Sequence, residues 1–453
     1  MDTVLIANRG EIAVRIIRAC RKMGLSTVAV CSEADMDSMH AQMADHTACI
    51  GPKSLKKSYL NINALLAVAR AYKARYVHPG VGFLSENMDF RRACREQGLI
   101  FIGPEASVME ALSDKLAVKN RLSGLGIPVI PGGTEPVRLV PEGLAVAREI
   151  GFPVLLKAAF GGGGMGIRRV DDECRFEELF NMVRAEAAAA FGSGEVYLEK
   201  LVLNARHIEV QVLADNFGNA LSFGTRECSL QRRSQKLLEE APACNLDRNI
   251  MRALQDTAIR IVQETGYTNA GTVEYLVDEN GNYYFIEMNT RIQVEHPATE
   301  AVTGVDLIQA QIMAAMGCNI SIRQEDLAPK GHAIECRINA ENPLTGFTPS
   351  PGRIEGLHMP GGMGIRVDSS VRPGDTIYPF YDSLVMKIIA HAEDRSACIR
   401  VMDQALSELR IDGISHNAQM HRELLKSPDF VQGRVYTKWI EEKFLPVYLK
   451  ERV

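Results

Sequence analysis

An Asn-Gly pair between two strand-like runs is the feature that most constrains how this chain can fold. Asn280-Gly281 separates the runs 272–277 and 283–289, which are rich in β-branched and aromatic residues. Asn-Gly is the strongest short-range hairpin signal because both residues tolerate a positive φ. The pattern predicts two adjacent antiparallel strands joined by a two-residue loop.

The register of this hairpin brings two glutamates together. A two-residue loop pairs Glu279 with Asn282, and counting outward sets Glu274 opposite Glu287. Directly opposed residues share a face with Cβ atoms roughly 5 Å apart, where like charges destabilise a sheet unless a cation separates them. Asn289 projects to the same side. Two carboxylates and a carboxamide suit a hard cation, Mg²⁺ above all. The alternative is a solvent-facing acidic patch on an edge hairpin.

The alternation of polar and apolar residues continues beyond the second run. In 287–295 the odd positions carry Glu, Asn, Arg, Gln and Glu. If the chain stays extended, Arg291, Gln293 and Glu295 lie beside the metal site. A cation, an amide and a carboxylate next to Mg²⁺ can hold and deprotonate a small anion. An ordinary amphipathic strand gives the same alternation, so this reading stays a hypothesis.

Size and charge exclude several classes of protein. At 453 residues the chain is too long for one core, which suggests about three domains. A net charge of −5 without a basic stripe argues against nucleic-acid binding, and no apolar run is long enough to span a membrane. The ten cysteines include no C-x-x-C pair, and the N-terminus has no signal-peptide pattern. We therefore expect a cytoplasmic, multidomain α/β protein.

Strand and helix signals divide the chain into five stretches. The first hundred residues alternate between strand and helix patterns, which predicts a parallel sheet. A helical linker is expected over 104–128, and a compact unit of strands and helices follows to about residue 203. Strands and hairpins are expected to dominate 206–290, followed by a helix at 304–316, and an α+β part begins near residue 332.

A glycine run suggests a phosphate-binding loop. Lys157 ends a predicted strand, and the segment 160–166, which includes Gly163 and Gly164, follows at once. Consecutive glycines leave backbone amides free to approach phosphates, and Lys157 adds charge from beneath. This is no Walker loop, since no Lys-Ser or Lys-Thr follows. A glycine-rich turn of purely structural use is the alternative.

Two further segments carry polar side chains in a pattern that fits a ligand site. His207, Glu209 and Gln211 alternate with apolar residues and so share one strand face, as they would in any half-exposed strand. The block 228–236 is densely cationic for an acidic protein, which fits contact with an anion, although a solvated loop would look the same.

Together these segments resemble the biotin carboxylases of the ATP-grasp superfamily, over essentially the whole chain. The run 287–297, EMNTRIQVEHP, is highly specific. Other matching segments are 7–12, 78–80, 82–87, 160–166, 228–236 and 335–341. The resemblance implies a multidomain protein of α/β and α+β parts. These are a Rossmann-like N-terminal domain (1–112), an ATP-grasp domain (113–331) with a mobile lid at about 130–203, and an α+β C-terminal domain (332–445).

The resemblance also implies a two-step reaction. ATP phosphorylates bicarbonate to carboxyphosphate, and the carboxyl group then passes to N1′ of biotin. By matching positions, Glu295 would be the base that deprotonates bicarbonate, and Arg291 would orient the transferring group. Arg337 would stabilise the enolate-like oxygen of the biotin ring. Bicarbonate would be enclosed by Lys236, Arg291, Gln293, Val294 and Glu295. Mg²⁺ or Mn²⁺ would be held by Glu274, Glu287 and Asn289. ATP would be bound by Lys115, Lys157, Gly163, Gly164, Glu199, Lys200, Leu201, Val202, His207 and Gln231.

Four positions depart from the pattern of the family. Val81 stands where a Tyr near the biotin pocket is usual, and Ser234 stands where a nucleotide-contacting His is usual. Phe160 and Met165 replace Gly and Arg in the lid. The metal and bicarbonate ligands are all kept, so the departures bear on ATP affinity, lid closure and contact with biotin.

The partners follow from the same resemblance. Met386-Lys387 matches the first two residues of a biotin-bearing Met-Lys-Met turn, but apolar residues continue through 388–390, which indicates a buried strand. The chain is therefore expected to act on a separate biotin carboxyl carrier protein, with a carboxyltransferase, as a homodimer in an acyl-CoA carboxylase. Alternatives are another ATP-grasp ligase and a non-catalytic or altered-acceptor paralogue in a carboxylase complex.

Overall fold

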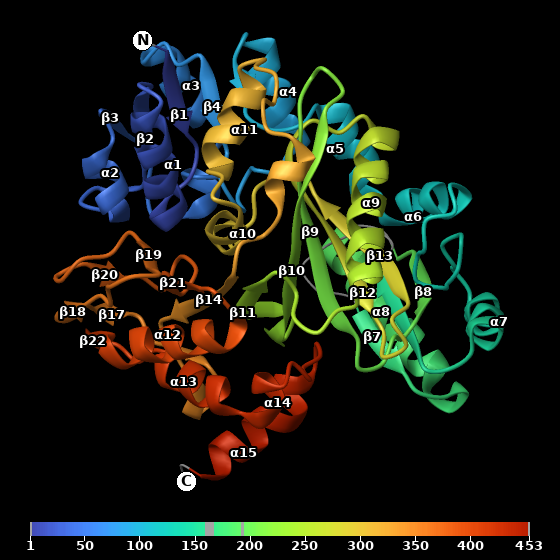
Figure 1. The fold of residues 1–453 in the computed structure, drawn as a ribbon. Helices are drawn as coiled ribbons and strands as arrows, with labels where there is room; N and C mark the ends of the chain where they lie inside the picture. The colour runs from blue at the N-terminus through green and yellow to red at the C-terminus, as the bar shows by residue number, and fades with distance from the viewer. Residues whose placement is uncertain (1, 159–166, 192–193, 452–453) are drawn as a thin grey trace.

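The computed structural model describes residues 2–158, 167–191 and 194–451. They form three parts that combine helices and sheets, with the N-terminal part in blue, the middle part in green and yellow, and the C-terminal part in orange and red (Figure 1). The expected combination of α/β and α+β parts is confirmed. Within the described residues, no helix combines the length and the apolar character that crossing a membrane requires.

The N-terminal part contains a five-stranded parallel sheet in the order β3-β2-β1-β4-β5. Its first helix forms because Ile12, Ile16 and Ile17 recur with helical spacing and are buried, and because Gly24 adopts φ +69° just beyond the helix end. The strands are β1 (Thr3–Ile6), β2 (Ser26–Cys31), β3 (His46–Cys49), β4 (Tyr76–His78) and β5 (Ile100–Phe101); the helices are α1 (Gly10–Lys22), α2 (Met39–Met43), α3 (Ile62–Ala71) and α4 (Met88–Glu96).

A small three-stranded unit projects from the middle part, at the right of Figure 1. Its antiparallel sheet has the order β7-β6-β8 and packs against two helices through a core of its own that includes Leu156, Phe180 and Leu198. Helices α5 (Ala106–Ser113) and α6 (Lys115–Gly124) lead into it. Its elements are α7 (Val140–Ile150), β6 (Val154–Ala158), β7 (Ile167–Val170), α8 (Phe176–Phe191) and β8 (Val196–Lys200).

An eight-stranded sheet joins the middle part to the C-terminal part. Its order is β13-β12-β9-β10-β11-β14-β21-β19, and β11 pairs with β14 across the predicted domain boundary at residue 332. The two parts therefore share backbone hydrogen bonds as well as side-chain contacts. The strands are β9 (Arg206–Ala214), β10 (Ala220–Arg232), β11 (Gln235–Ala241), β12 (Asn269–Val277), β13 (Tyr283–Asn289), β14 (His332–Asn339), β19 (Ile365–Ser369) and β21 (Leu384–Ala392).

Strands dominate 206–290 as predicted, but this range also contains a helix that was not predicted. Helix α9 (Arg248–Thr265) lies between β11 and β12 and covers β9 and β10. Its start and end are both visible in the sequence, because Asp247 caps the first turn and Gly266 adopts φ +65° after the last. The helix expected at 304–316 is confirmed with slightly different ends, and a separate helix that was not predicted precedes it. Gly304, at φ +72°, ends α10 (His296–Thr303), and α11 (Leu307–Ala315) follows.

The hairpin of β12 and β13 has the predicted register for a different reason. Its loop has three residues rather than two, because Asp278 N–H donates to the carbonyl of Asn282. An irregularity between Glu274 and Tyr275 then shifts the pairing by one residue, which restores Glu274 opposite Glu287. The predicted pairing of the two glutamates is confirmed, whereas the predicted loop is wrong.

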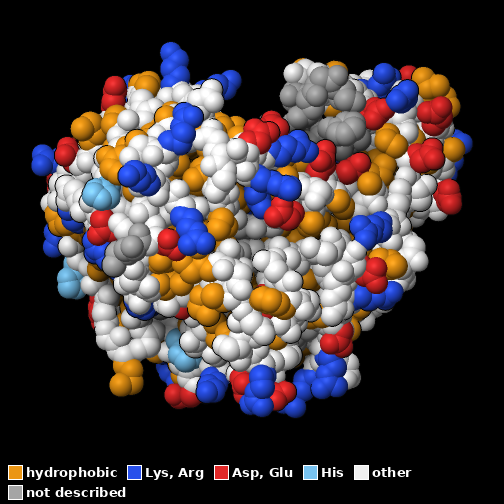
Figure 2. All heavy atoms as spheres, turned by 90° about the horizontal axis from the view of Figure 1, so that it is seen from above, with side chains coloured by type: hydrophobic (Ala, Val, Ile, Leu, Met, Phe, Trp, Pro, Cys, Tyr) orange, Lys and Arg blue, Asp and Glu red, His pale blue; other side chains and the backbone are white. Residues whose placement is uncertain are grey.

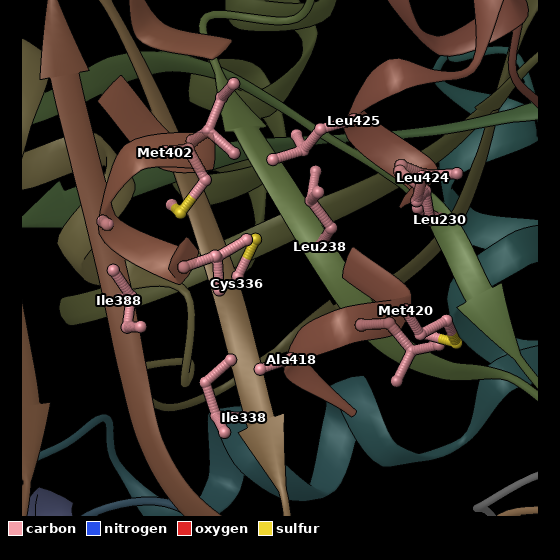
Figure 3. Packing of buried hydrophobic residues seen from close by; sticks show 14 of the residues in the cluster. Leu230, Leu238, Cys336, Ile338, Ile388, Met402, Ala418, Met420, Leu424 and Leu425 are labelled. Carbon is pink, nitrogen blue, oxygen red and sulfur yellow. The ribbon is translucent and has the colours of Figure 1, made fainter. Parts of the chain in front are cut away.

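The C-terminal part packs its helices on one face of the shared sheet. Figure 3 shows Leu238, Cys336 and Ile388, from three adjacent strands, meeting Met402 and Leu425. The predicted core helix at 396–409 is α12 (Arg395–Glu408). The remaining elements are β15 (Glu341–Asn342), β16 (Thr348–Pro349), β17 (Gly352–Arg353), β18 (Gly356–His358), β20 (Thr376–Ile377), β22 (Arg410–Asp412), α13 (Ala418–Lys426), α14 (Pro428–Val431) and α15 (Leu445–Lys450).

Candidate active site

Lys236, near the start of β11, lies at the centre of the candidate site. Its Nζ contacts Glu209 Oε2 at 2.7 Å, Glu274 Oε1 at 3.1 Å and Glu295 Oε1 at 2.6 Å. Burial alone would lower the pKa of Lys236, but the three carboxylates hold it well above its usual value. The lysine is therefore a permanently protonated group, and its ion pairs link β11 to β9, to β12 and to the start of α10. In the view from above, Figure 2 shows acidic and basic side chains next to one another around an indentation of the visible face.

Glu274 collects most of the polar contacts of the acidic hairpin. Its Oε1 accepts from Asn289 Nδ2 and from Gln293 Nε2, both at 2.8 Å, and its Oε2 lies 3.1 Å from His207 Nε2. Burial would raise the pKa of Glu274, yet Lys236 and His207 hold it well below its usual value. A buried, ionised carboxylate with these partners excludes the alternative of a solvent-facing acidic patch.

The outer strand of the hairpin, β13, is partly covered by another segment of the chain. β13 is the edge strand of the sheet, but Phe285 N–H donates to Pro128 O at 2.9 Å, so the linker covers part of the edge. Glu287 is about one third exposed and accepts from Lys115 Nζ at 2.6 Å. The acidic pair therefore has one buried member and one that opens toward solvent.

Beyond Asn289 the chain does not stay extended as predicted. β13 ends there, and Glu295 is the N-cap residue of α10. The side chains converge nonetheless, because Gln293 turns toward Glu274 and Glu295 toward Lys236. Arg291 donates to Glu86 Oε2 at 3.0 Å and to Asn289 Oδ1 at 3.3 Å, so it lies beside the hairpin but has no hydrogen bond to Glu274 or Glu295 among the described residues.

Glu295 lies between two cations. Its Oε1 contacts Lys236 and its Oε2 accepts from Arg337 Nη2 at 2.8 Å. Although burial raises the pKa of a carboxyl group, Lys236, Arg337 and Arg226 lower that of Glu295 far enough to keep it ionised. Arg337 is itself anchored by Glu239 Oε1, which accepts from its Nε at 2.6 Å.

The strand face that bears His207, Glu209 and Gln211 points into this site and is buried, with only His207 keeping a little exposed surface, so it is not half-exposed. Arg226, which pairs with Glu209 across β9 and β10, was not identified from the sequence. It has no exposed surface and donates to Glu209, Gln211, Thr299 and Gln293. In the sequence Arg226 lies in a consecutive polar run, Thr225-Arg-Glu227, which gives no alternation, so its burial could be recognised only once the strand pairing was known.

Replacing Arg226 by Met should destabilise the protein strongly. The change removes the buried donor to Glu209 Oε1, Gln211 Oε1 and Gln293 Oε1, and breaking a buried ion pair costs about 3–5 kcal/mol. Urea unfolding followed by circular dichroism would measure the loss. The double variant Arg226→Met with Glu209→Gln should recover part of it, because the buried charge that lost one of its two cationic partners is removed. A loss below about 1 kcal/mol would show that Arg226 is not structurally important.

The predicted nucleotide residues lie along β6, β8 and the linker. Glu199 accepts from Lys119 Nζ at 3.2 Å and from Lys157 Nζ. Lys157 on β6 and Glu199 on β8 therefore form an ion pair within the three-stranded unit. Burial would raise the pKa of Glu199, but the two lysines lower it. Lys200 Nζ donates to Gly151 O at 2.7 Å, and Leu201 and Val202 are half-buried where β8 ends. The predictions for Phe160, Gly163, Gly164 and Met165 lie outside the described residues.

Several remaining residues are placed between these two regions. Gln231 Nε2 lies 2.6 Å from His207 Nδ1, and the other ring nitrogen of His207 lies beside Glu274, so Gln231 is linked to Glu274 through His207. Val294 supplies its carbonyl to Lys387 Nζ at 2.8 Å. Lys387 is fully buried in β21, which confirms that it lies in a strand and not in a biotin-bearing turn. Ser234 is exposed, at φ +63°, in the turn between β10 and β11. Val81 is half-buried against the core that includes Ile6 and Ile16.

Two clusters of possible metal ligands also appear in the buried network. Ligand atoms of His207, Glu209 and Glu274 lie within 4.8 Å of one another, as do those of Glu209, Cys228 and Glu295. Because Lys236 contacts all three glutamates, the positive charge at these clusters is already supplied. The hairpin pair Glu274 and Glu287 remains the better candidate for a metal ion. All ten cysteines are free thiols.

Comparisons with known proteins cover nearly the whole chain. Three family models match: the biotin carboxylase N-terminal domain at 1–109, the ATP-binding domain of the carbamoyl-phosphate synthase L chain at 114–323, and the biotin carboxylase C-terminal domain at 335–442. Biotin carboxylase 1 of Bacillus subtilis is 50% identical over 442 residues, which is 97% of this chain and 98% of the relative.

Solved structures agree with these matches. A Campylobacter jejuni biotin carboxylase in a βγ-ATP complex is 43% identical, with a TM-score of 0.94 over 97% of this chain and 98% of that one. The biotin carboxylase domain dimer of Hydrogenobacter thermophilus 2-oxoglutarate carboxylase, solved with MgADP, ADP and bicarbonate, is 44% identical. Its TM-score is 0.93 over 97% of both chains.

Proposed function

Since the chain belongs to the biotin carboxylase family of ATP-dependent ligases, we propose that it carboxylates biotin on a separate carrier protein as the first half-reaction of an acyl-CoA carboxylase. The observation that carries the assignment is the contact of Glu295 with both Lys236 and Arg337, beside the hairpin of Glu274 and Glu287. A carboxylate base between two cations, next to a pair of acidic oxygen donors, is suited to deprotonating and phosphorylating a small anion.

The donor set of the hairpin fits a magnesium or manganese ion. Glu274 and Glu287 are directly opposed and Asn289 contacts Glu274, so hard oxygen ligands meet on one face. A divalent cation held there would neutralise negative charge on the phosphates of ATP. Lys115, which now contacts Glu287, would be free to turn to a phosphate once the carboxylate is occupied.

ATP would be held between the three-stranded unit and the eight-stranded sheet. Lys157 and Lys115 would contact phosphates together with Gly163 and Gly164. The segment Glu199, Lys200, Leu201 and Val202 would offer backbone groups to the purine, and His207 and Gln231 would lie beyond it. The arrangement of charges supports this placement, because the buried Glu199 carboxylate forms ion pairs with two lysines, Lys119 and Lys157, and so holds both cations together.

Bicarbonate would lie beside Glu295. Lys236, Arg291, Gln293 and Val294 would complete its enclosure. Glu295 would take the bicarbonate proton, and the freed oxygen would attack the terminal phosphorus of ATP to give carboxyphosphate and ADP. Lys236 would remain protonated throughout, since its carboxylate partners hold its pKa high, and would neutralise the developing charge.

Biotin would receive the carboxyl group beside Arg337. The guanidinium is oriented by Glu239 and Glu295, so one of its faces is fixed before the substrate arrives. It would stabilise the oxygen of the ureido ring while N1′ attacks the carboxyl carbon of carboxyphosphate, the bond from that carbon to the phosphate oxygen breaks, and the released phosphate takes the N1′ proton. Val81, which is shorter than the aromatic residue usual in the family, would leave more room on the biotin side.

The wider assignment includes partners and location. We expect a biotin carboxyl carrier protein and a carboxyltransferase as partners, a homodimer, and a cytoplasmic setting. The dimer of the Hydrogenobacter relative supports the homodimer. Lys387 is buried and bonded, so the biotin would come from a carrier and not from this strand. The same relative belongs to a 2-oxoglutarate carboxylase, which makes a 2-oxo acid the second candidate for the final acceptor.

The first test is ADP release by the purified protein with MgATP. We expect release to require bicarbonate and to rise when free biotin is added. Biotinylated carrier proteins from an acetyl-CoA carboxylase and from a 2-oxo-acid carboxylase can then be compared, and the acyl-CoA assignment predicts the higher kcat/KM with the former. Bicarbonate-dependent release that ignores biotin would indicate an altered acceptor. No release from a folded protein that binds ATP would favour the non-catalytic alternative.

A further inference from the structure

The eight-stranded sheet has a charged face opposite the apolar core of Figure 3. Leu238, Cys336 and Ile388 point into that core. Side chains alternate along a strand, so the odd-numbered neighbours on β11 and β14 point the other way, toward α10. Two of these, Glu239 and Glu335, are directly paired across the strands and neither has any exposed surface.

The hydrogen bonds of this pair are incomplete. Glu239 Oε1 accepts from Arg337, but Glu239 Oε2 and both oxygens of Glu335 have no hydrogen-bond partner among the described residues. An ionised carboxylate buried without donors costs several kcal/mol. Two opposed carboxyl groups in a dry interior cannot both ionise, and a proton between them satisfies an acceptor on each.

The charges that face the pair come from every element packed against it. Lys236 lies on β11, Arg337 on β14 and Lys387 on β21, and Glu295 and His296 lie at the start of α10. Lys387 is bonded to Val294 O and Glu11, so it does not complete the bonding of Glu335. Burial lowers the pKa of His296 well below its usual value, which leaves it neutral.

We propose that Glu239 and Glu335 share one proton at neutral pH, and that Glu335 acts as a positioning residue for Arg337. The proton held between Glu335 and Glu239 Oε2 limits the pair to one negative charge. Glu239 Oε1 then anchors the Nε of Arg337 while Nη2 stays on Glu295. The inference rests on the proposed function, in which Arg337 faces the biotin ring.

The titration directions agree with this geometry. Burial raises the pKa of Glu239 to about 7, against the lowering effect of Arg337, and burial raises that of Glu335 well above its usual value. When the shared proton leaves for solvent at higher pH, a second negative charge appears beside the guanidinium. Arg337 is then drawn toward the pair and away from biotin, so carboxyl transfer should fall on the alkaline side.

The test is the pH profile of biotin carboxylation in matched variants. Glu335→Gln offers a permanent N–H donor to Glu239 and should move the alkaline fall upward by at least about one pH unit. Glu335→Leu offers no donor and should lose about tenfold or more in transfer to biotin at neutral pH, as expected for a displaced catalytic cation. Glu240→Gln is the control, because this buried glutamate faces the other side of β11 and bonds to His332 and Arg395. It should keep the alkaline fall of the unmodified protein.

Infrared spectroscopy reads the proton without any activity. The unmodified protein at neutral pH should show a protonated carboxyl C=O band that disappears at alkaline pH, is lost in Glu335→Gln and remains in Glu240→Gln. The same band and the same pH profile in Glu335→Gln as in the unmodified protein would overturn the inference. Failure of the proposed function is distinct, since the protein would then not carboxylate biotin while the infrared band still reported on the pair.

Discussion

Replacing Glu295 by Gln is expected to reduce bicarbonate-dependent ADP release by about 10²–10⁴-fold, the usual contribution of a general base. The amide keeps the size of the side chain but cannot take the bicarbonate proton. The neutral amide also removes the carboxylate that Lys236 and Arg337 share, so each cation loses one ionised partner. Steady-state ADP release at saturating MgATP and bicarbonate measures the loss directly.

Two further measurements separate chemistry from binding. Calorimetric titration with ATP should give similar affinities for Glu295→Gln and the unmodified protein, because Glu295 has no predicted contact with the nucleotide. Glu295→Asp keeps a base but withdraws it by one methylene, so its activity should lie between the two. If Glu295→Gln keeps more than a tenth of the activity, Glu295 is not the base.

Replacing Glu287 by Gln should raise the magnesium concentration needed for activity by 10–100-fold or more. Loss of groups that merely orient a metal ligand costs about 10–100-fold in metal affinity, and loss of the ligand itself should cost at least as much. The neutral amide also leaves Lys115 without its carboxylate. Magnesium titrations of ADP release give the shift.

The hairpin supplies its own control for this experiment. Glu279 lies in the loop of the same hairpin, is exposed and bonds to Asn204, so Glu279→Gln should leave the magnesium dependence unchanged. Calorimetry of ADP binding with and without Mg²⁺ gives a second readout that needs no catalysis. An unchanged effect of Mg²⁺ on ADP affinity in Glu287→Gln would remove Glu287 from the metal site.

The departures at Val81 and Ser234 affect the edges of the site more than its centre. Ser234 is exposed in a turn, two residues from Lys236, and Val81 is held by its backbone carbonyl, which accepts from Asn8 Nδ2 at 2.8 Å. Among the described residues, no hydrogen bond or ion pair joins either side chain to Glu274, Glu287 or Glu295. The charged centre is therefore expected to be retained, with differences confined to nucleotide and biotin contacts.

The acidic hairpin shows how far local patterns can lead. Period-two alternation and the Asn-Gly turn predicted that Glu274 faces Glu287, and the structure has this pairing. The loop is one residue longer than predicted, and a strand irregularity compensates for the extra residue. Turn length and bulges depend on how the hairpin fits its neighbours, which local sequence does not encode.

The charged residues around Glu295 show the opposite limit. Arg226, Glu239 and Glu335 lie on three different strands, and the first and last are more than a hundred residues apart in sequence. They come to lie around Glu295 only because β11 pairs with both β10 and β14. Their burial also cannot be inferred from their charge, since isolated charged residues are ordinarily exposed.

By itself the sequence determined the strand and helix pattern, the facing glutamates of the hairpin and the family, because these depend on short-range periodicity, turn chemistry and motif spacing. Only the tertiary structure decided which charges neutralise one another. Long-range strand pairing carries Lys236 to three carboxylates, Arg337 to Glu295, and Glu239 to Glu335. The ionisation of buried groups follows from those contacts, since in a dry interior a charge persists only where a partner of opposite sign lies within reach.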